Sequence, residues 1–401
     1  MGPFSVRDYR ENVGVDIKKY DFVDTLRGYA ILGVILVHSA EWISPHSSVL
    51  KLIMSSGATG VQLFYIASAM TLCMSLDVRS AREGSPLRNF FIRRFFRIAP
   101  LFYLAIIAYT WLYGFSERYW APNGVKWWFI PLTALFLHGT HPETVTSVVP
   151  GGWSIAVEMA FYVMLPFLFR RLRTVGSLVL FCVLALVANR LAALVVPVLL
   201  SGYYPSSQQY LVSNFTYLSL LGQLPVFAIG MLTFRFWKHL RGRRDLLLSC
   251  GLLACAMLLF FALLSVETFM SIIPQHVLYG VAFAVLSLAL ALYRLPIVIN
   301  PIIVWLGRLS FSMYLSHFAV ITMLEKSEVA RFLPQGDLSS GLAFGIVVLL
   351  TACLSFVTYH CIERPGISLG RGAIGLLESD RRGFSARRFL VRDAALQRPV
   401  E

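Results

Sequence analysis

A basic residue and a histidine lie within the first apolar stretch of this chain, in Asp24-Thr-Leu-Arg27-Gly-Tyr-Ala-Ile-Leu-Gly-Val-Ile-Leu-Val-His38. Ionisable side chains at membrane depth are costly, so each is a functional-site hypothesis. A helical rise of about 1.5 Å per residue separates Arg27 from His38 by about 16 Å. We therefore expect Arg27 near one membrane face and His38 well inside the bilayer, where its imidazole could take a proton from a hydroxyl group.

Two more ionisable side chains are predicted at the depth of His38. Glu158 lies about two turns after the start of the apolar stretch that opens Gly151-Gly-Trp-Ser, and His317 lies in the outer half of a later stretch. Each alone could be a buried, hydrogen-bonded core group. Their predicted common depth in the membrane favours a catalytic role, because a carboxylate beside a histidine orients the ring and stabilises its charged form. We expect His38 to be a general base, with Glu158 or His317 positioning the base or its hydroxyl substrate.

A second constellation is basic and is predicted at the other membrane face. Arg94 and Arg97 lie three residues apart in Arg88-Asn-Phe-Phe-Ile-Arg93-Arg94-Phe-Phe-Arg97, on one helical face. Guanidinium groups bind phosphate through two parallel hydrogen bonds, so a cytosolic nucleotide or a lipid phosphate is a candidate ligand. The alternative is that the cluster only sets topology, since positive charge gathers at cytoplasmic helix ends in any case.

The composition identifies the elements that must position these residues. Of 401 residues, 57% are hydrophobic and 14% charged, and the mean hydropathy is +0.69. This is more apolar surface than one globular core could bury, so the sequence predicts an all-α polytopic membrane protein with about ten transmembrane helices. They are expected at 22–43, 58–78, 98–116, 152–169, 175–200, 214–235, 246–266, 272–293, 301–323 and 339–361.

The positive charges predict the orientation. Most of the 35 Lys and Arg residues fall in alternate loops and in the two terminal segments, which places both termini in the cytoplasm. We expect a cytoplasmic segment at 1–21, the membrane domain at 22–366 and a basic cytoplasmic tail at 367–401. The net charge of +14 then reflects topology and gives no support for nucleic-acid binding.

One apolar segment, 127–138, is too short to cross a membrane. If it did cross, every later basic loop would lie outside. We expect an interfacial or re-entrant segment on the outer side. The alternative is a short additional transmembrane helix. The six cysteines contain no Cys-x-x-Cys pair, so we expect no disulfide framework and no metal site.

Taken in order, these motifs resemble the membrane-bound acyltransferase-3 family over about residues 20–366. The matching segments are the Arg27 to His38 spacing, Arg94 with Arg97, Trp153-Ser154 with Glu158 and Phe161-Tyr162, the run Leu306-Gly-Arg-Leu-Ser310-Phe-Ser-Met-Tyr314-Leu-Ser-His317, and Glu363-Arg364-Pro365. One departure is Ala67-Ser68-Ala69, where the family often has Ser-Gly. This difference could alter packing near the path of the acceptor.

The resemblance implies an O-acyltransferase of cell-surface glycans in a bacterial inner membrane. It implies an acyl-CoA donor, expected to be acetyl-CoA, on the cytoplasmic side, a hydroxyl of a glycan or lipid-linked sugar as acceptor on the outer side, and no permanently bound cofactor. Arg94, Arg97 and Arg27 would hold the CoA phosphates or line the path of the thioester, and membrane lipids would surround the protein.

Two other classes of protein fit part of the pattern. A transporter or flippase of a lipid-linked sugar would also be polytopic with buried charges, but would predict matching halves with broken helices, which are not evident. A bis-histidine haem protein could ligate iron through His38 and His317, and its visible absorption spectrum would identify it.

Overall fold

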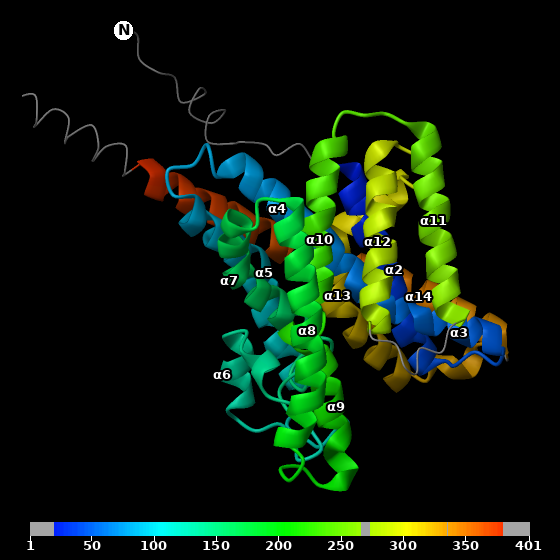
Figure 1. The fold of residues 1–401 in the computed structure, drawn as a ribbon. Helices are drawn as coiled ribbons and strands as arrows, with labels where there is room; N and C mark the ends of the chain where they lie inside the picture. Colours follow the sequence, from blue (N-terminus) through cyan, green and yellow to red (C-terminus); the bar gives the residue numbers. More distant parts are fainter. Residues whose placement is uncertain (1–19, 266–272, 335, 380–401) are drawn as a thin grey trace, which may run out of the picture.

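The computed structural model describes residues 20–265, 273–334 and 336–379, and these residues form helices and no strands. The helices are α2 (Asp21–Trp42), α3 (Ser48–Ser56), α4 (Gly60–Arg79), α5 (Pro86–Tyr113), α6 (Phe129–Ala134), α7 (Trp153–Arg171), α8 (Val175–Leu199), α9 (Gln209–Leu218), α10 (Leu220–Leu240), α11 (Leu246–Ser265), α12 (Gln275–Leu292), α13 (Pro301–Lys326) and α14 (Asp337–Thr358) (Figure 1).

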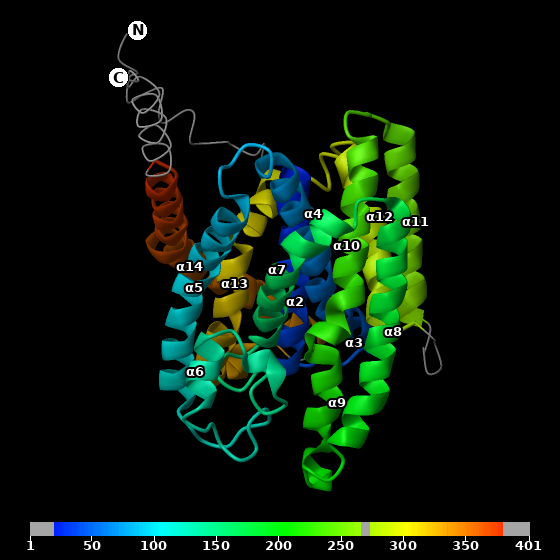
Figure 2. The same ribbon diagram turned by 60° about the vertical axis from the view of Figure 1, so that its left-hand side comes forward.

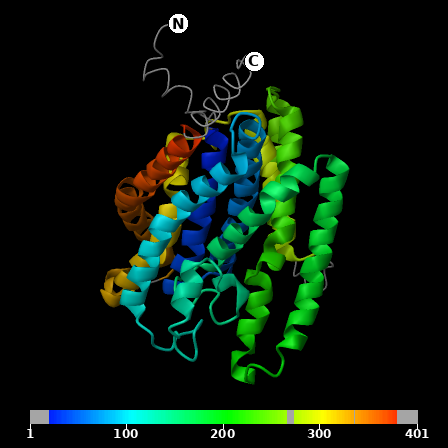
Figure 3. The same ribbon diagram turned by 90° about the vertical axis from the view of Figure 1, so that its left-hand side faces the viewer.

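Nine helical segments of the described residues are long and apolar enough to cross a membrane. This confirms the prediction of an all-α polytopic membrane protein. The remaining predicted span, 301–323, corresponds to α13, which is 26 residues long but is not among the nine. The start of α2 and the end of the last described helix lie at the same end of the bundle, and α6 lies at the opposite end (Figure 3).

Helix boundaries differ from the prediction in two places that matter for the site. α5 begins at Pro86, well before the predicted residue 98, because proline is favoured in the first turn of a helix and the following basic residues continue it. The predicted span 214–235 is interrupted at Ser219, which separates α9 from α10 and accepts a hydrogen bond from the Gly222 amide at 3.1 Å. The segment 127–138 contains the six-residue α6, and it is not among the nine segments long enough to cross a membrane.

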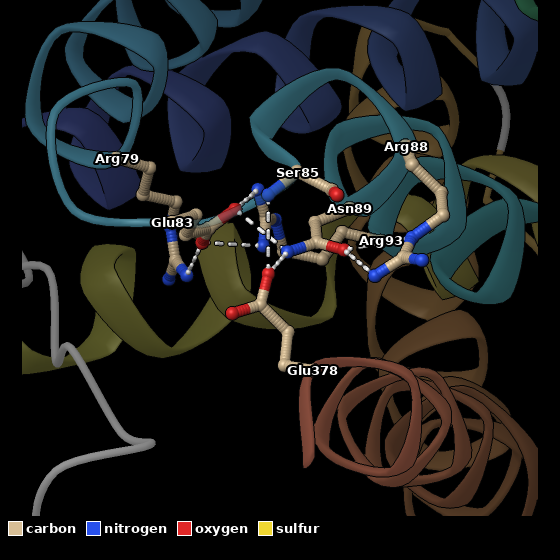
Figure 4. Close-up of polar contacts among 7 residues, drawn as sticks. All are labelled: Arg79, Glu83, Ser85, Arg88, Asn89, Arg93 and Glu378. Carbon is tan, nitrogen blue, oxygen red and sulfur yellow. Dashed lines mark hydrogen bonds and ion pairs between the residues drawn. The ribbon is translucent and has the colours of Figure 1, made fainter. Parts of the chain in front are cut away.

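The last helix extends beyond the predicted membrane domain. After α14 a π-helical turn, Tyr359–Glu363, leads into helix as far as residue 379. Near its end Glu378 accepts hydrogen bonds from Asn89 Nδ2 at 2.8 Å and from the Ser85 amide at 3.3 Å (Figure 4). Asn89 also donates to Glu83, which pairs with Arg93 at 2.8 and 3.0 Å. This network fixes the last helix to the start of α5.

α2 and α13 are held unusually close along the centre of the bundle. A Cβ on Gly28 would lie 2.3 Å from the Ile303 carbonyl oxygen, and a Cβ on Gly307 would lie 1.7 Å from that of Asp24. Only glycine allows such an approach of two backbones. This contact places the second halves of α2 and α13, which carry His38 and His317, side by side.

Candidate active site

A central cavity of about 70 Å³ lies between α2, α4, α5, α7 and α13, which come together in the middle of the bundle (Figure 2). Its lining combines three arginines, one glutamate and several hydroxyl groups with aromatic rings. The lining residues are Arg27, Val61, Phe64, Tyr65, Ser68, Arg94, Arg97, Ile98, Ser154, Ile155, Glu158, Tyr162, Ser310, Phe311 and Tyr314. Four of the six predicted site residues, Arg27, Arg94, Arg97 and Glu158, therefore meet in one place.

Glu158 is oriented in this cavity by two hydroxyl groups. Tyr162, one turn later on α7, donates to Oε1 at 2.5 Å, and Ser68 of α4 donates to the same oxygen. In the described part of the chain no hydrogen bond reaches Oε2, so that oxygen is open to a ligand. Ser68 belongs to the Ala-Ser-Ala departure from the family pattern and was not predicted as a site residue.

The three arginines of the cavity are held by different means. Arg27 donates from Nη2 to Thr71 Oγ1 at 3.0 Å and has Nη1 4.0 Å from the Asp24 carboxylate. The guanidinium of Arg94 lies over the ring of Tyr162, 5.9 Å from its centroid. An aromatic face stabilises a cation without neutralising it. Arg94 thus keeps its charge available to an anion.

Arg97 faces a second buried carboxylate, that of Glu363. Glu363 is 2% exposed and accepts a hydrogen bond from Ser312 Oγ at 2.8 Å. A buried carboxylate needs an opposite charge and hydrogen bonds to remain ionised. The sequence analysis used Glu363 only as part of a motif, and the π-helical turn that directs it inward leaves no signal in the sequence.

His38 lies outside the central cavity, paired with a carboxylate of its own helix. Its Nδ1 is 2.9 Å from Oε2 of Glu41, three residues later, and its side chain is 25% exposed. This leaves Nε2 free to accept a proton. The sequence analysis missed Glu41, although His-x-x-Glu on a helix places the two side chains on neighbouring turns.

His317 is completely buried beside His38. The two ring centroids are 5.3 Å apart, and the ring of Phe318 packs against both, at 4.4 Å from His38 and 4.2 Å from His317. Nδ1 of His317 lies 3.3 Å from the Met313 carbonyl oxygen, and its Nε2 has no hydrogen-bond partner. Because the two rings and that of Phe318 pack directly against one another, no space is left for a haem plane between the two histidines.

Tyr314 connects the central cavity with the histidines. It lines the cavity, accepts a hydrogen bond from Ser154 Oγ at 2.7 Å and donates to the Gly151 carbonyl oxygen at 2.9 Å. Its ring centroid is 5.8 Å from that of His317. Polar groups therefore continue from the arginines past Glu158 and Tyr314 to the histidine pair.

Glu158 differs in depth from the expectation that it shares the level of the histidines. The prediction counted turns from the start of α7, as if that helix began at the membrane surface. Instead, the preceding segment folds into the bundle, where Thr144, Thr146 and Ser147 are buried. α7 therefore begins inside the protein, and Glu158 lies among the arginines while Glu41 accompanies His38.

His138, in this inward-folded segment, is a buried base that was not predicted. Its Nε2 donates to the Gly152 carbonyl oxygen at 2.9 Å, while Nδ1 has no partner. Burial lowers the pKa of His138 to about 4, so the ring is neutral near pH 7. It anchors the loop that positions Gly151 against Tyr314.

Comparisons with known proteins show the family of this chain. A family model described as an acyltransferase domain matches residues 20–360. Relatives include proteins named O-acetyltransferase OatA from Staphylococcus aureus strains NCTC 8325 / PS 47 and COL, each 22% identical over 92% of this chain. The chain spans 60% of the length of these relatives. No solved structure matches.

Proposed function

The chain belongs to the acyltransferase-3 family of multi-pass membrane proteins, and we propose that it moves an acetyl group from cytosolic acetyl-CoA to a hydroxyl of a cell-envelope glycan or lipid-linked sugar. O-Acetyl transfer is the activity named in its relatives. The proposed location is the inner membrane of a bacterium, with both termini in the cytoplasm.

The observation that carries this proposal is the pairing of His38 with Glu41. The carboxylate holds Nδ1 at 2.9 Å, which fixes the ring and stabilises the imidazolium that forms when Nε2 takes a proton. The ring is partly exposed, so a hydroxyl group can reach it. A histidine in this setting is suited to activate an alcohol as a nucleophile.

The proposed reaction needs no group beyond donor and acceptor. The acceptor hydroxyl gives its proton to Nε2 of His38 as its oxygen forms a bond to the thioester carbonyl carbon. The carbon–sulfur bond then breaks, and the CoA thiolate takes the proton back from the imidazolium. The products are an O-acetyl ester and CoA.

The donor assignment depends on the charges of the central cavity. Arg27, Arg94 and Arg97 are partly buried and line one cavity, and guanidinium groups bind phosphate and oxyanions through charge-assisted hydrogen bonds. In this proposal Glu158 and the arginines lie along the path of the thioester, and Tyr314 leads from that path towards His317 and His38. His317 then acts as a positioning residue for the base.

Aromatic side chains at the α6 end of the protein support the acceptor assignment. Trp111 is 83% exposed and Trp127 is 78% exposed. Indole rings of this kind lie at membrane interfaces and can stack against sugar rings. We assign this end to the outer side of the membrane.

The test compares a deletion strain with its parent by mass spectrometry of envelope glycans. The parent should carry O-acetyl groups that the deletion strain lacks, and the wild-type gene should restore them while the His38→Ala variant should not. Unchanged acetylation in the deletion strain would contradict the proposal. A sugar that accumulates unmodified in the cytoplasm would instead indicate a flippase.

A further inference from the structure

A second hollow, away from the central cavity, gathers three arginines. This basic hollow, defined by Arg170, Arg173 and Arg235, has a volume of about 440 Å³ and lies between α4, α5, α7, α8 and α10. The remaining lining residues are Cys73, Leu76, Asp77, Ser80, Pro86, Leu87, Pro166, Phe169, Leu172, Leu178, Met231 and Phe234. Apolar side chains thus make up most of its lining, and the charged and polar groups are Asp77, Ser80 and the three arginines.

The charges of the basic hollow are not balanced by its own residues. Within the described ranges, none of the three guanidinium groups forms an ion pair, and their contacts are to backbone: Arg173 Nε donates to the Arg170 carbonyl oxygen at 3.0 Å, and Arg235 to that of Arg173. The lining carboxylate, Asp77, is neutralised by Lys238 at 2.7 and 2.8 Å. Three like charges around one hollow favour an anion with several negative charges.

The position of the basic hollow relates it to the central cavity. Both are lined by α4, α5 and α7, and the basic hollow lies farther along each of them. At about 1.5 Å per residue, Arg170 lies about 18 Å beyond Glu158 along α7, and Leu87 about 10 Å beyond Arg94 along α5. A ligand that reaches both places must be long, with its anionic groups at one end.

We propose that the basic hollow binds the phosphates at the nucleotide end of the CoA donor, while the thioester end of the same molecule reaches the central cavity. This inference rests on the proposed function. CoA carries a pyrophosphate and a 3′-phosphate at one end of a flexible arm and its thioester at the other. Arg170, Arg173 and Arg235 fit the first end, and Arg94, Arg97 and Glu158 line the path by which the second end approaches His38.

The experiment measures equilibrium binding of CoA to the full-length protein in nanodiscs of zwitterionic lipid. The test variant carries Arg170→Gln, Arg173→Gln and Arg235→Gln. The matched control is Arg171→Gln, because Arg171 is next in sequence to Arg170 but lies over the Phe167 ring at 5.3 Å, outside the hollow. We expect the triple variant to bind CoA at least about 100-fold more weakly than wild type, and the control to bind within about twofold.

A second probe, 3′-dephospho-CoA, separates recognition of phosphate from a general loss of charge. Wild type should bind it about tenfold more weakly than CoA, whereas the triple variant should bind both molecules alike. The single variant Arg170→Gln, which changes an exposed side chain, is measured in the same way, so that a poorly folded triple variant does not decide the result.

Three outcomes overturn the inference in different ways. Wild type that binds no CoA would remove the proposed donor itself. CoA binding that is equal in wild type and the triple variant would leave the donor in place and refute this location. Unchanged CoA affinity together with loss of copurifying anionic lipid, measured by native mass spectrometry, would assign the basic hollow to a lipid headgroup.

Discussion

Glu41 lies one helical turn beyond His38 on α2, with Oε2 2.9 Å from Nδ1 of the ring. The two residues form the carboxylate–histidine pair of the proposed reaction, and the ring of His317 on α13 lies 5.3 Å from that of His38. The roles of these residues can be separated by substitution.

His38→Ala should lower the rate of acetyl transfer by about 100- to 10,000-fold, because a general base contributes that much to proton transfer. Glu41→Gln should have a smaller effect, about 10- to 100-fold, since it removes a charge-assisted hydrogen bond but keeps the ring. The measurement is CoA release from acetyl-CoA in inverted vesicles. His46→Ala, on a histidine outside this pair, is the control, and near-parental activity of His38→Ala would refute the assignment.

Glu158 and Ser68 should act as one unit. Glu158→Gln and Ser68→Ala should each lower kcat/KM by about 10- to 100-fold, because each removes a hydrogen bond that involves a charged group. Since Ser68 donates to Glu158, the double variant should lose much less than the product of the single effects. Strictly multiplicative losses would show that Ser68 does not work through Glu158.

Replacing Arg94 and Arg97 by alanine should raise the KM for acyl-CoA, because each arginine offers charge-assisted hydrogen bonds worth roughly 1.5 to 3 kcal/mol. Lysine at both positions should restore binding only in part, since a point charge cannot reproduce the guanidinium fork. The measurement is KM in inverted vesicles, with protein level as the control. An unchanged KM together with a lower protein level would mean that Arg94 and Arg97 only set the membrane topology of the protein.

The sequence predicted those features that depend on local patterns. Apolar length identified the spans, and the spacing of Arg94 and Arg97 placed both on one face of α5, as the cavity confirms. The sequence could not predict the depth of Glu158 in the protein, because the depth of α7 depends on how the loop before that helix folds into the bundle. That loop is polar in sequence, with Thr144, Thr146 and Ser147, and looks exposed until tertiary packing buries it.

Long-range contacts explain why other features of the site were not predicted from the sequence. The proximity of His38 and His317 was predicted only as a shared depth. Their contact depends on the close approach of α2 and α13 at Gly28 and Gly307, which are far apart in the chain. Glu363 lies on a π-helical turn that no sequence period indicates, close enough to Arg97 for their charges to interact. The His38–Glu41 pair follows from spacing alone, although the predicted carboxylate partner was Glu158 on another helix.

Protonation of His138 should destabilise the protein in mild acid. Its pKa is about 4 in the folded state and about 6.5 when exposed, so the unfolded chain binds more protons between these values and stability falls as pH drops through them. At pH 5 the loss from this group is on the order of 2 kcal/mol relative to pH 7. Thermal unfolding in detergent should show a smaller pH dependence for His138→Gln than for wild type, and equal dependence would contradict the role of burial.

The proposed orientation predicts which loops face the outside of the cell. The segment 140–148 is largely buried, so a cysteine there would report packing and not topology. Ser116 and Arg244 are exposed and belong to the segments that follow α5 and α10. These two segments lie at opposite ends of the bundle (Figure 1). With the six native cysteines replaced by alanine, Ser116→Cys should react with a membrane-impermeant thiol reagent in intact cells. Arg244→Cys should react only after the membrane is opened, because its basic loop belongs on the cytoplasmic side. The reverse pattern would move the basic hollow to the outside of the cell, where no acyl-CoA is available, and would contradict the donor side of the proposed reaction.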